Sequence, residues 1–158
     1  MPGPKERLSR SSVALISRRH DGEMRWLTRW NRPWSSLAFV GGHKEGAETY
    51  QQCILREIQE ELGLVDGLDF TLVAEPRAVL EFDAFSERAQ VETGYVMTLY
   101  DVLLLDTPET AALDRDPDVR WVTEAEIRAR RNAEGLPISP TLARILAVVS
   151  PGRSSSQS

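Results

Sequence analysis

One stretch, residues 41–64, decides the fold of this chain; it reads GGHKEGAETYQQCILREIQEELGL. Ile54, Ile58 and Leu62 recur in it every four residues, which predicts a helix with one apolar stripe facing a core. Gly63 follows, and glycine favours the left-handed conformation that closes helices because it has no Cβ. The stretch therefore predicts a glycine turn and then about four turns of helix that end at Gly63.

The same helix carries an unusual cluster of carboxylates. Glu57, Glu60 and Glu61 stand at positions i, i+3 and i+4, which groups them on a face that the apolar stripe does not use. Like charges at this spacing weaken a helix by about a few tenths of a kcal/mol per pair. A divalent cation would reverse that repulsion, and carboxylate oxygens are ligands that Mg²⁺ and Mn²⁺ prefer. The spacing alone also fits a solvated face in which Arg56 and Glu60 form an i,i+4 ion pair.

The complete pattern of the stretch decides between these interpretations. It resembles the signature of the Nudix hydrolase family, G-x5-E-x7-R-E-U-x-E-E-x-G-U, where U is an aliphatic residue. Every specified position is filled, by Gly42, Glu48, Arg56, Glu57, Ile58, Glu60, Glu61, Gly63 and Leu64. From average residue usage, chance would give such a match at on the order of one start position in a billion. The resemblance covers only this stretch and says little about the substrate.

The resemblance implies a fold and a reaction. The fold is α+β, a Nudix-type α/β/α sandwich with a mixed sheet, the helix of the signature and C-terminal helices. The reaction is hydrolysis of a pyrophosphate bond in a small nucleoside diphosphate-linked compound, such as a nucleotide, a nucleotide sugar, ADP-ribose or a dinucleoside polyphosphate. It would depend on Mg²⁺, for which Mn²⁺ can substitute. The alternative is a non-catalytic nucleotide-binding sensor, which loss of signature glutamates would favour, whereas all of them are present.

The resemblance also assigns roles by position. Glu57, Glu60 and Glu61 match the metal-binding carboxylates, and Glu57 or a bridging water is a candidate base. The carbonyl of Gly41 matches the main-chain metal ligand of the family. Arg56 is expected to orient the glutamates by ion pairing, which also keeps them ionised.

Two features of the stretch leave alternatives open. Glu48 either supports the metal ligands or caps the helix dipole. The family usually carries Leu-Pro-Gly-Gly before the helix, where this chain has residues 39–42 as Phe-Val-Gly-Gly, so loop stiffness should differ more than the chemistry. An isomerase on the same fold would need a catalytic cysteine, and Cys53 lies inside the helix, where a small buried hydrophobe is a more common role than a reactive thiol.

Residues outside the signature are candidates for binding substrate. Trp34 could stack on a nucleobase, Arg32 could reach phosphates, and His43 directly follows the glycine pair. Arg29 and Arg77 are further candidates for phosphate contacts. A base or an additional metal ligand could come from a group of carboxylates, each of which also fits a solvated surface residue: Glu92, Asp101, Glu109, Asp114 and Asp116.

The remaining elements follow from patterning. Residues 12–30 predict a hairpin with an Asp21-Gly22 turn, and residues 37–40 a short strand. Further strands are expected at 70–74, 78–85, 92–105 and 119–122. The acidic segment 106–118 is expected to be a functional loop. Helices are expected after Thr123 and after Ser139.

The length and charge of the chain limit the domain organisation and the partners that we expect. The chain has 158 residues and is expected to form one domain over residues 12–150, with a flexible arm at 1–11 and a disordered tail at 151–158. The net charge is −5 without a basic run, so a small phosphorylated partner is favoured over a nucleic-acid polymer. No apolar run reaches the roughly 20 residues of a membrane span, and no signal peptide is evident. We expect a cytoplasmic protein without membrane contact; a homodimer is left open.

Overall fold

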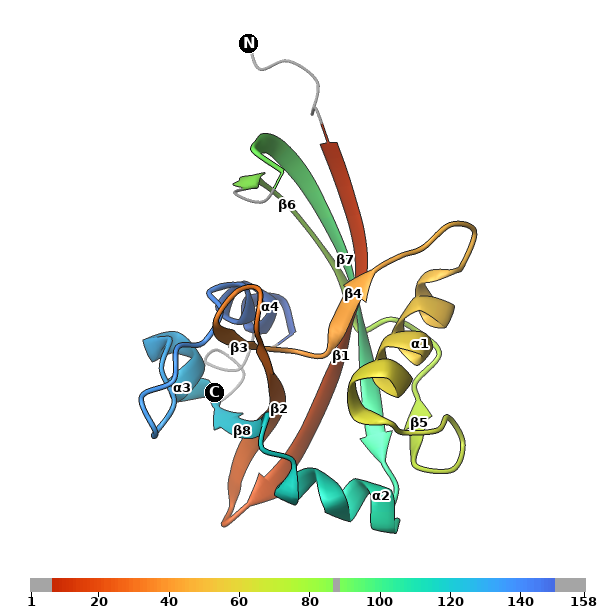
Figure 1. Cartoon of the computed structure of the whole chain (residues 1–158), viewed down its shortest axis with the longest axis vertical. Helices are drawn as coiled ribbons and strands as arrows, with labels where there is room; N and C mark the ends of the chain where they lie inside the picture. Colours follow the sequence, from red (N-terminus) through yellow and green to blue (C-terminus); the bar gives the residue numbers. More distant parts are fainter. Residues whose placement is uncertain (1–6, 87–88, 150–158) are drawn as a thin grey trace, which may run out of the picture.

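Strand β1 (Arg7–His20) is a long strand in the middle of the sheet (Figure 1). The computed structural model describes residues 7–86 and 89–149. The other strands are β2 (Glu23–Asn31), β3 (Ser36–Ala38), β4 (Gly41–His43), β5 (Phe70–Leu72), β6 (Ala78–Ser86), β7 (Val91–Leu104) and β8 (Val119–Thr123). The helices are α1 (Tyr50–Leu62), α2 (Pro108–Ala111), the 3₁₀ helix η1 (Ala112–Arg115), α3 (Glu124–Ala129) and α4 (Thr141–Val149).

The alternation of side chains along β1 creates two cores. Successive strand residues point to opposite faces of a sheet. Val13 and Leu15 pack into a cluster that includes the buried residues of α4, whereas Ala14 and Ile16 pack into a second cluster with those of α1. The sheet is therefore covered on both faces, which confirms the predicted α/β/α sandwich.

The pairing of β1 makes the sheet mixed and brings the glycine turn to its centre. β1 runs parallel to β7 from Arg7, opposite Thr93, to Ile16, opposite Val102. It runs antiparallel to β2 and to β4, where Ser12 lies opposite Gly42. The hairpin predicted for residues 12–30 is confirmed as β1–β2.

Helix α1 begins and ends through local contacts. The Thr49 side chain accepts a hydrogen bond from the backbone N–H of Gln52, and the Gln52 side chain accepts one from the N–H of Thr49. This capping box satisfies two donors at the helix start. Gly63 adopts the expected left-handed conformation, with φ of 69°, and donates its N–H to the Gln59 carbonyl. No helix in the described part of the chain is long and apolar enough to cross a membrane.

Two expectations about irregular segments need correction. β1 begins at Arg7, so residues 7–11 of the expected arm are strand, held by parallel pairing with β7. Residues 1–6 of that arm and the expected tail at 151–158 lie outside the described residues. The segment 106–118 is not a loop, because α2 and η1 occupy its centre. The Thr107 side chain accepts from the Thr110 N–H to start α2, and Leu113 is buried.

The α4-facing core is expected to depend on Leu99 of β7. Leu99 is fully buried, whereas Leu103, four residues along the same strand and on the same face, is 57% exposed. We expect Leu99→Ala to lower the free energy of unfolding by about 2–5 kcal/mol through lost burial and a cavity. Leu103→Ala is the matched control and should change it by no more than about 0.5 kcal/mol. Urea unfolding of both variants measures this, and equal losses would contradict the assignment of this core.

Candidate active site

The Arg56 guanidinium joins helix α1 to the loop before it. It donates hydrogen bonds to both carboxylate oxygens of Glu48, at 2.8 and 3.1 Å, and to the His43 carbonyl at 3.0 Å. It also donates to Glu57 at 2.9 Å and to Glu60 at 3.2 Å. These contacts raise the pKa of Arg56 further and hold the pKa of Glu48 at about 2. Glu48 therefore serves as the ion partner of Arg56, while Thr49 caps the helix.

Two of the three signature glutamates meet beside the glycine turn. Burial, a hydrogen bond with Glu57 and the charge of Glu57 raise the pKa of Glu61 to about 8. The Gly41 N–H donates to Glu61 Oε2 at 3.4 Å. A Cβ at Gly42 would collide with the Glu57 carboxylate, and one at Gly41 with the Ser12 carbonyl. The clash at Gly41 is with backbone, so glycine is required there for the turn to pair with β1, whereas a side chain at position 42 would displace the Glu57 carboxylate.

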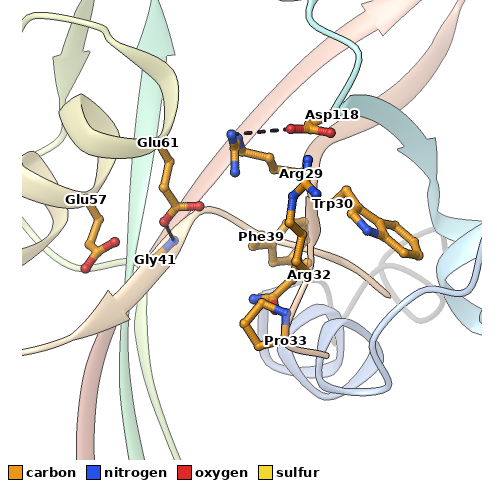
Figure 2. A pocket seen from close by; sticks show the side chains of 11 residues that line it. Arg29, Trp30, Arg32, Pro33, Phe39, Gly41, Glu57, Glu61 and Asp118 are labelled. Atoms are coloured by element: carbon orange, nitrogen blue, oxygen red, sulfur yellow. Dashed lines mark hydrogen bonds and ion pairs between the residues drawn. The ribbon is translucent and has the colours of Figure 1, made fainter. Parts of the chain in front are cut away.

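These carboxylates border a cavity of about 310 Å³ (Figure 2). Glu57 and Glu61 extend into it from α1, and Arg29 extends toward them from β2. Asp118, directly before β8, lies on the far side and pairs with Arg29, with 3.5 Å between Arg29 Nη2 and Asp118 Oδ2. The remaining residues that line the cavity are Trp30, Asn31, Arg32, Pro33, Ala38, Phe39 and Gly41. The guanidinium groups of Arg29 and Arg32 and the carboxylates of Glu57 and Glu61 thus line one open space.

Glu60, the third signature glutamate, does not line this cavity. Its side chain is 58% exposed and is paired with Arg56. Among the described residues, no three His, Cys, Asp or Glu side chains are arranged to hold a metal ion. The predicted site is therefore divided in this conformation, with Glu57 and Glu61 inside the cavity and Glu60 on the solvent side of the helix.

Four of the five residues predicted to bind substrate line one of two neighbouring cavities, and Arg77 lines neither. Arg32 lines the cavity just described. Trp34 and His43 line a second, larger cavity of about 630 Å³. The two cavities share four lining residues: Asn31, Ala38, Phe39 and Gly41. They are therefore adjacent compartments of one depression rather than separate sites.

The additional carboxylates proposed from sequence lie elsewhere. Asp101 binds Arg77 at 2.9 Å, and Asp114 binds Arg18 at 3.1 Å. Asp116 accepts from the Asp118 N–H. None of these three, nor Glu92 or Glu109, lines the cavity with Glu57.

Asp118 was missed as an individual candidate from the sequence. It is the last residue of the acidic segment that was assigned a functional role. Its position directly before a predicted strand was the available signal, because β8 pairs with β2 and so aligns Asp118 with the end of β2 that carries Arg29.

Cys53 is buried within α1. It is fully inaccessible, and its Sγ donates to the Gly42 carbonyl at 3.4 Å. Burial raises the pKa of this thiol. The structure supports a small packing residue rather than a reactive thiol.

Comparisons with known proteins agree on one family. The NUDIX domain family model matches residues 8–142. An isopentenyl-diphosphate Delta-isomerase of Nocardia farcinica is 30% identical over 125 residues, which are 77% of this chain and 64% of that protein. The chain thus spans less than two thirds of the length of this curated relative.

Solved structures share the fold at low sequence identity. The Ap4A hydrolase of C. elegans superimposes with a TM-score of 0.60 at 16% identity, covering 91% of this chain and 97% of that one. The NUDIX domain of Shewanella oneidensis NrtR, crystallised with ADP ribose, gives a TM-score of 0.57 at 17% identity and covers 97% and 90%. With the signature of α1 complete and the family model matched over most of its length, this chain belongs to the Nudix hydrolase family.

Proposed function

We propose that this protein hydrolyses the pyrophosphate bond of a small nucleoside diphosphate-linked compound, with the help of a divalent cation. The observation that carries the proposal is the cavity that Glu57 and Glu61 line together with Arg29 and Arg32. Carboxylates suit a cation, and guanidinium groups suit phosphate oxygens. Family membership and the fold shared with the Ap4A hydrolase support the same reaction class.

The residues fit a hard divalent cation such as Mg²⁺ or Mn²⁺. Two carboxylates in hydrogen-bond contact need either a proton or a cation between them, and Glu61 holds a proton at neutral pH because its pKa is raised. Glu57, Glu61 and the Gly41 carbonyl would supply oxygen ligands, and Glu60 on the same helix would complete the set implied by the signature. A bound cation would neutralise the adjacent phosphates and make a water nucleophilic.

The protein's own groups would orient the reactants. Arg29 and Arg32 would donate hydrogen bonds to the phosphate oxygens and so align the anhydride. Asp118 holds the Arg29 guanidinium and is, with Glu57, a candidate to accept the proton of the attacking water. Arg56 does not line the cavity and is a positioning residue, because its hydrogen bonds fix Glu57 relative to the glycine turn.

The isomerase reaction of the Nocardia relative is disfavoured for this chain. That reaction was expected to need a catalytic cysteine, whereas Cys53, the single cysteine of the chain, is buried and donates to the Gly42 carbonyl. A sensor that binds a nucleotide without cleaving it would use the same cavity, and only turnover separates it from a hydrolase.

The first prediction concerns metal binding. Calorimetric titration with Mg²⁺ or Mn²⁺ should give a saturable signal that the double variant Glu57→Gln, Glu61→Gln loses, since both oxygen ligands lose their charge. Glu75→Gln, an exposed change outside the cavity, is the matched control and should bind like the wild type. Unchanged binding in the double variant would place the cation elsewhere.

The second prediction separates chemistry from folding at Glu61. Its pKa is raised from 4.5 to about 8, so the folded metal-free protein holds a proton that the unfolded chain releases. The free energy of unfolding should then fall as pH rises from about 4.5 to about 8. Glu61→Gln cannot ionise, so in EDTA at about pH 8.5 it should melt a few degrees above the wild type, and the difference should shrink at about pH 5.

The same variant should be nearly inactive. We expect kcat with Mg²⁺ to fall at least about a hundredfold, or roughly 2.7 kcal/mol, because a misplaced metal or water forfeits several kcal/mol. Rates on ADP-ribose, nucleotide sugars, nucleoside triphosphates and dinucleoside polyphosphates test this beside the melts. A variant that unfolds at lower temperature yet keeps its rate per folded molecule would make Glu61 structural.

The third prediction concerns phosphate binding by Arg29. Arg29→Gln should raise KM for the best substrate about tenfold, since one charge-assisted hydrogen bond is worth roughly 1.5–3 kcal/mol. The control is Arg25, which lies four residues earlier on β2, is paired with Glu23 and does not line the cavity. The variant Arg25→Gln should therefore keep the KM of the wild type. Similar KM values in both variants would remove Arg29 from the site.

A further inference from the structure

At one end of the molecule the sheet extends beyond helix α1 (Figure 1). The helix begins at Tyr50, whose carbonyl accepts a hydrogen bond from the Ser12 hydroxyl of β1 at 2.6 Å. Side chains alternate along a strand, and residues opposite one another in neighbouring strands share a side of the sheet. At and beyond Ser12, β1, β7 and β6 therefore present one surface on the side of α1. We call it the open face; it includes Leu8 and Arg10 of β1, Val96 of β7, and Val79, Glu81 and Phe85 of β6.

The open face carries apolar side chains that remain in contact with solvent. Leu8 is 49% exposed, Val79 52% and Phe85 51%. Single exposed apolar residues are ordinary on a protein surface, whereas apolar residues gathered on one face mark a contact with another molecule. The described part of the chain does not bury these three side chains, so the contact would be with a separate molecule.

A row of three residues crosses the open face. Arg10 and Glu81 each lie directly opposite Val96, which is on the strand between them. The row is therefore a base, an apolar residue and an acid. Neighbouring strands are about 4.8 Å apart, so the backbones of Arg10 and Glu81 are separated by about 10 Å. Both residues are exposed, and neither side chain forms an ion pair or a hydrogen bond in the described part of the chain.

This row is complementary to itself under one two-fold rotation. In an isologous contact the same surface of two copies meets. If two copies meet face to face about an axis parallel to β7, β6 of each copy lies over β1 of the other. Val96 then meets Val96, and each Arg10 faces Glu81 of the other copy. An axis that runs across the strands would instead set Arg10 on Arg10 and Glu81 on Glu81, so the charges select the first arrangement.

The edge of the sheet beside this face is a poorer contact. Among the described residues, β6 pairs with β7 alone and is an edge strand. Glu81 and Asp83 occupy its middle, so an antiparallel pairing of two copies centred there would set acidic side chains against one another. Charged residues on an edge strand disfavour such edge-to-edge pairing. The face, rather than the edge, is the surface that fits a second copy.

We propose that the open face is a contact surface between two copies of this chain, related by a two-fold axis parallel to β7. The proposal does not depend on the reaction at the candidate active site. Strand dimensions give the face a length of roughly 20 Å and a width of roughly 15 Å. Such a face is small beside the roughly 800 Å² that each partner contributes to a standard interface. The dimer should therefore exchange with the monomer instead of being permanent.

The first test is the mass of the full chain in solution. Sedimentation equilibrium from micromolar to millimolar concentration is measured at low ionic strength, where surface charge pairs are least screened. We expect the average mass to rise with concentration from that of one chain toward that of two. A mass that stays at the value of one chain throughout would overturn the proposal.

Charge reversal then locates the contact. Arg10→Glu and Glu81→Arg each create two like-charged pairs in the proposed dimer, so each should raise the Kd of dimerisation about tenfold or more. An equimolar mixture of the two variants should recover a Kd close to that of the wild type, because both pairs of the mixed dimer are again of opposite sign. Recovery would also show that both variants are folded.

The control is Glu75→Arg, which makes the same change of charge at an exposed residue outside the open face and should dimerise like the wild type. A mixture that dimerises no better than its two components would overturn the proposal, because the pairs would not cross between copies. Dimerisation that resists both charge reversals, or that Glu75→Arg weakens equally, would overturn it as well.

Discussion

The close approach of Gly42 to the Glu57 carboxylate is the constraint on which the site depends. Any side chain at position 42 would occupy the space of that carboxylate, and any side chain at 41 would meet the backbone of β1. Glycine at position 41 lets β4 pair with β1, and glycine at position 42 leaves the Glu57 carboxylate in place against the turn. Arg56 then fixes the arrangement by binding both the helix and the His43 carbonyl. Sheet, turn and helix are thereby held in one geometry.

Local signals predicted the elements around this constraint well. The i,i+4 stripe and Gly63 defined α1, and the Asp21-Gly22 turn defined the first hairpin, because these are decided by neighbouring residues. The segment 106–118 was predicted poorly. Its acidic side chains and prolines resemble a loop, yet Thr107 and Pro108 start α2, and Leu113 is buried in η1, which follows directly. A short helix held by one buried residue leaves little periodicity to detect.

The candidate active site was likewise predictable only where local sequence decides it. Residues of the signature could be assigned roles by resemblance, and Arg29 and Arg32 could be named as candidates for phosphate contacts. Their placement in one cavity with the glutamates could not be predicted. Arg29 and Asp118 are distant in sequence and meet only because β2 pairs with β8. The stacked rings of Phe82 and Tyr95 in the larger cavity likewise require the register of β6 on β7. The contact between Arg29 and Asp118 depends on pairing between strands that are not joined by a short turn, so no local turn sets its register.

The position of Cys53 gives the chain a built-in reporter. It is the single thiol of the sequence, it is inaccessible, and it donates to the carbonyl of Gly42. An alkylating reagent can reach the sulfur only when the turn lifts from the helix or when the helix frays. The rate of alkylation therefore measures how often the turn opens, and a ligand that clamps the turn slows that rate without any engineered label.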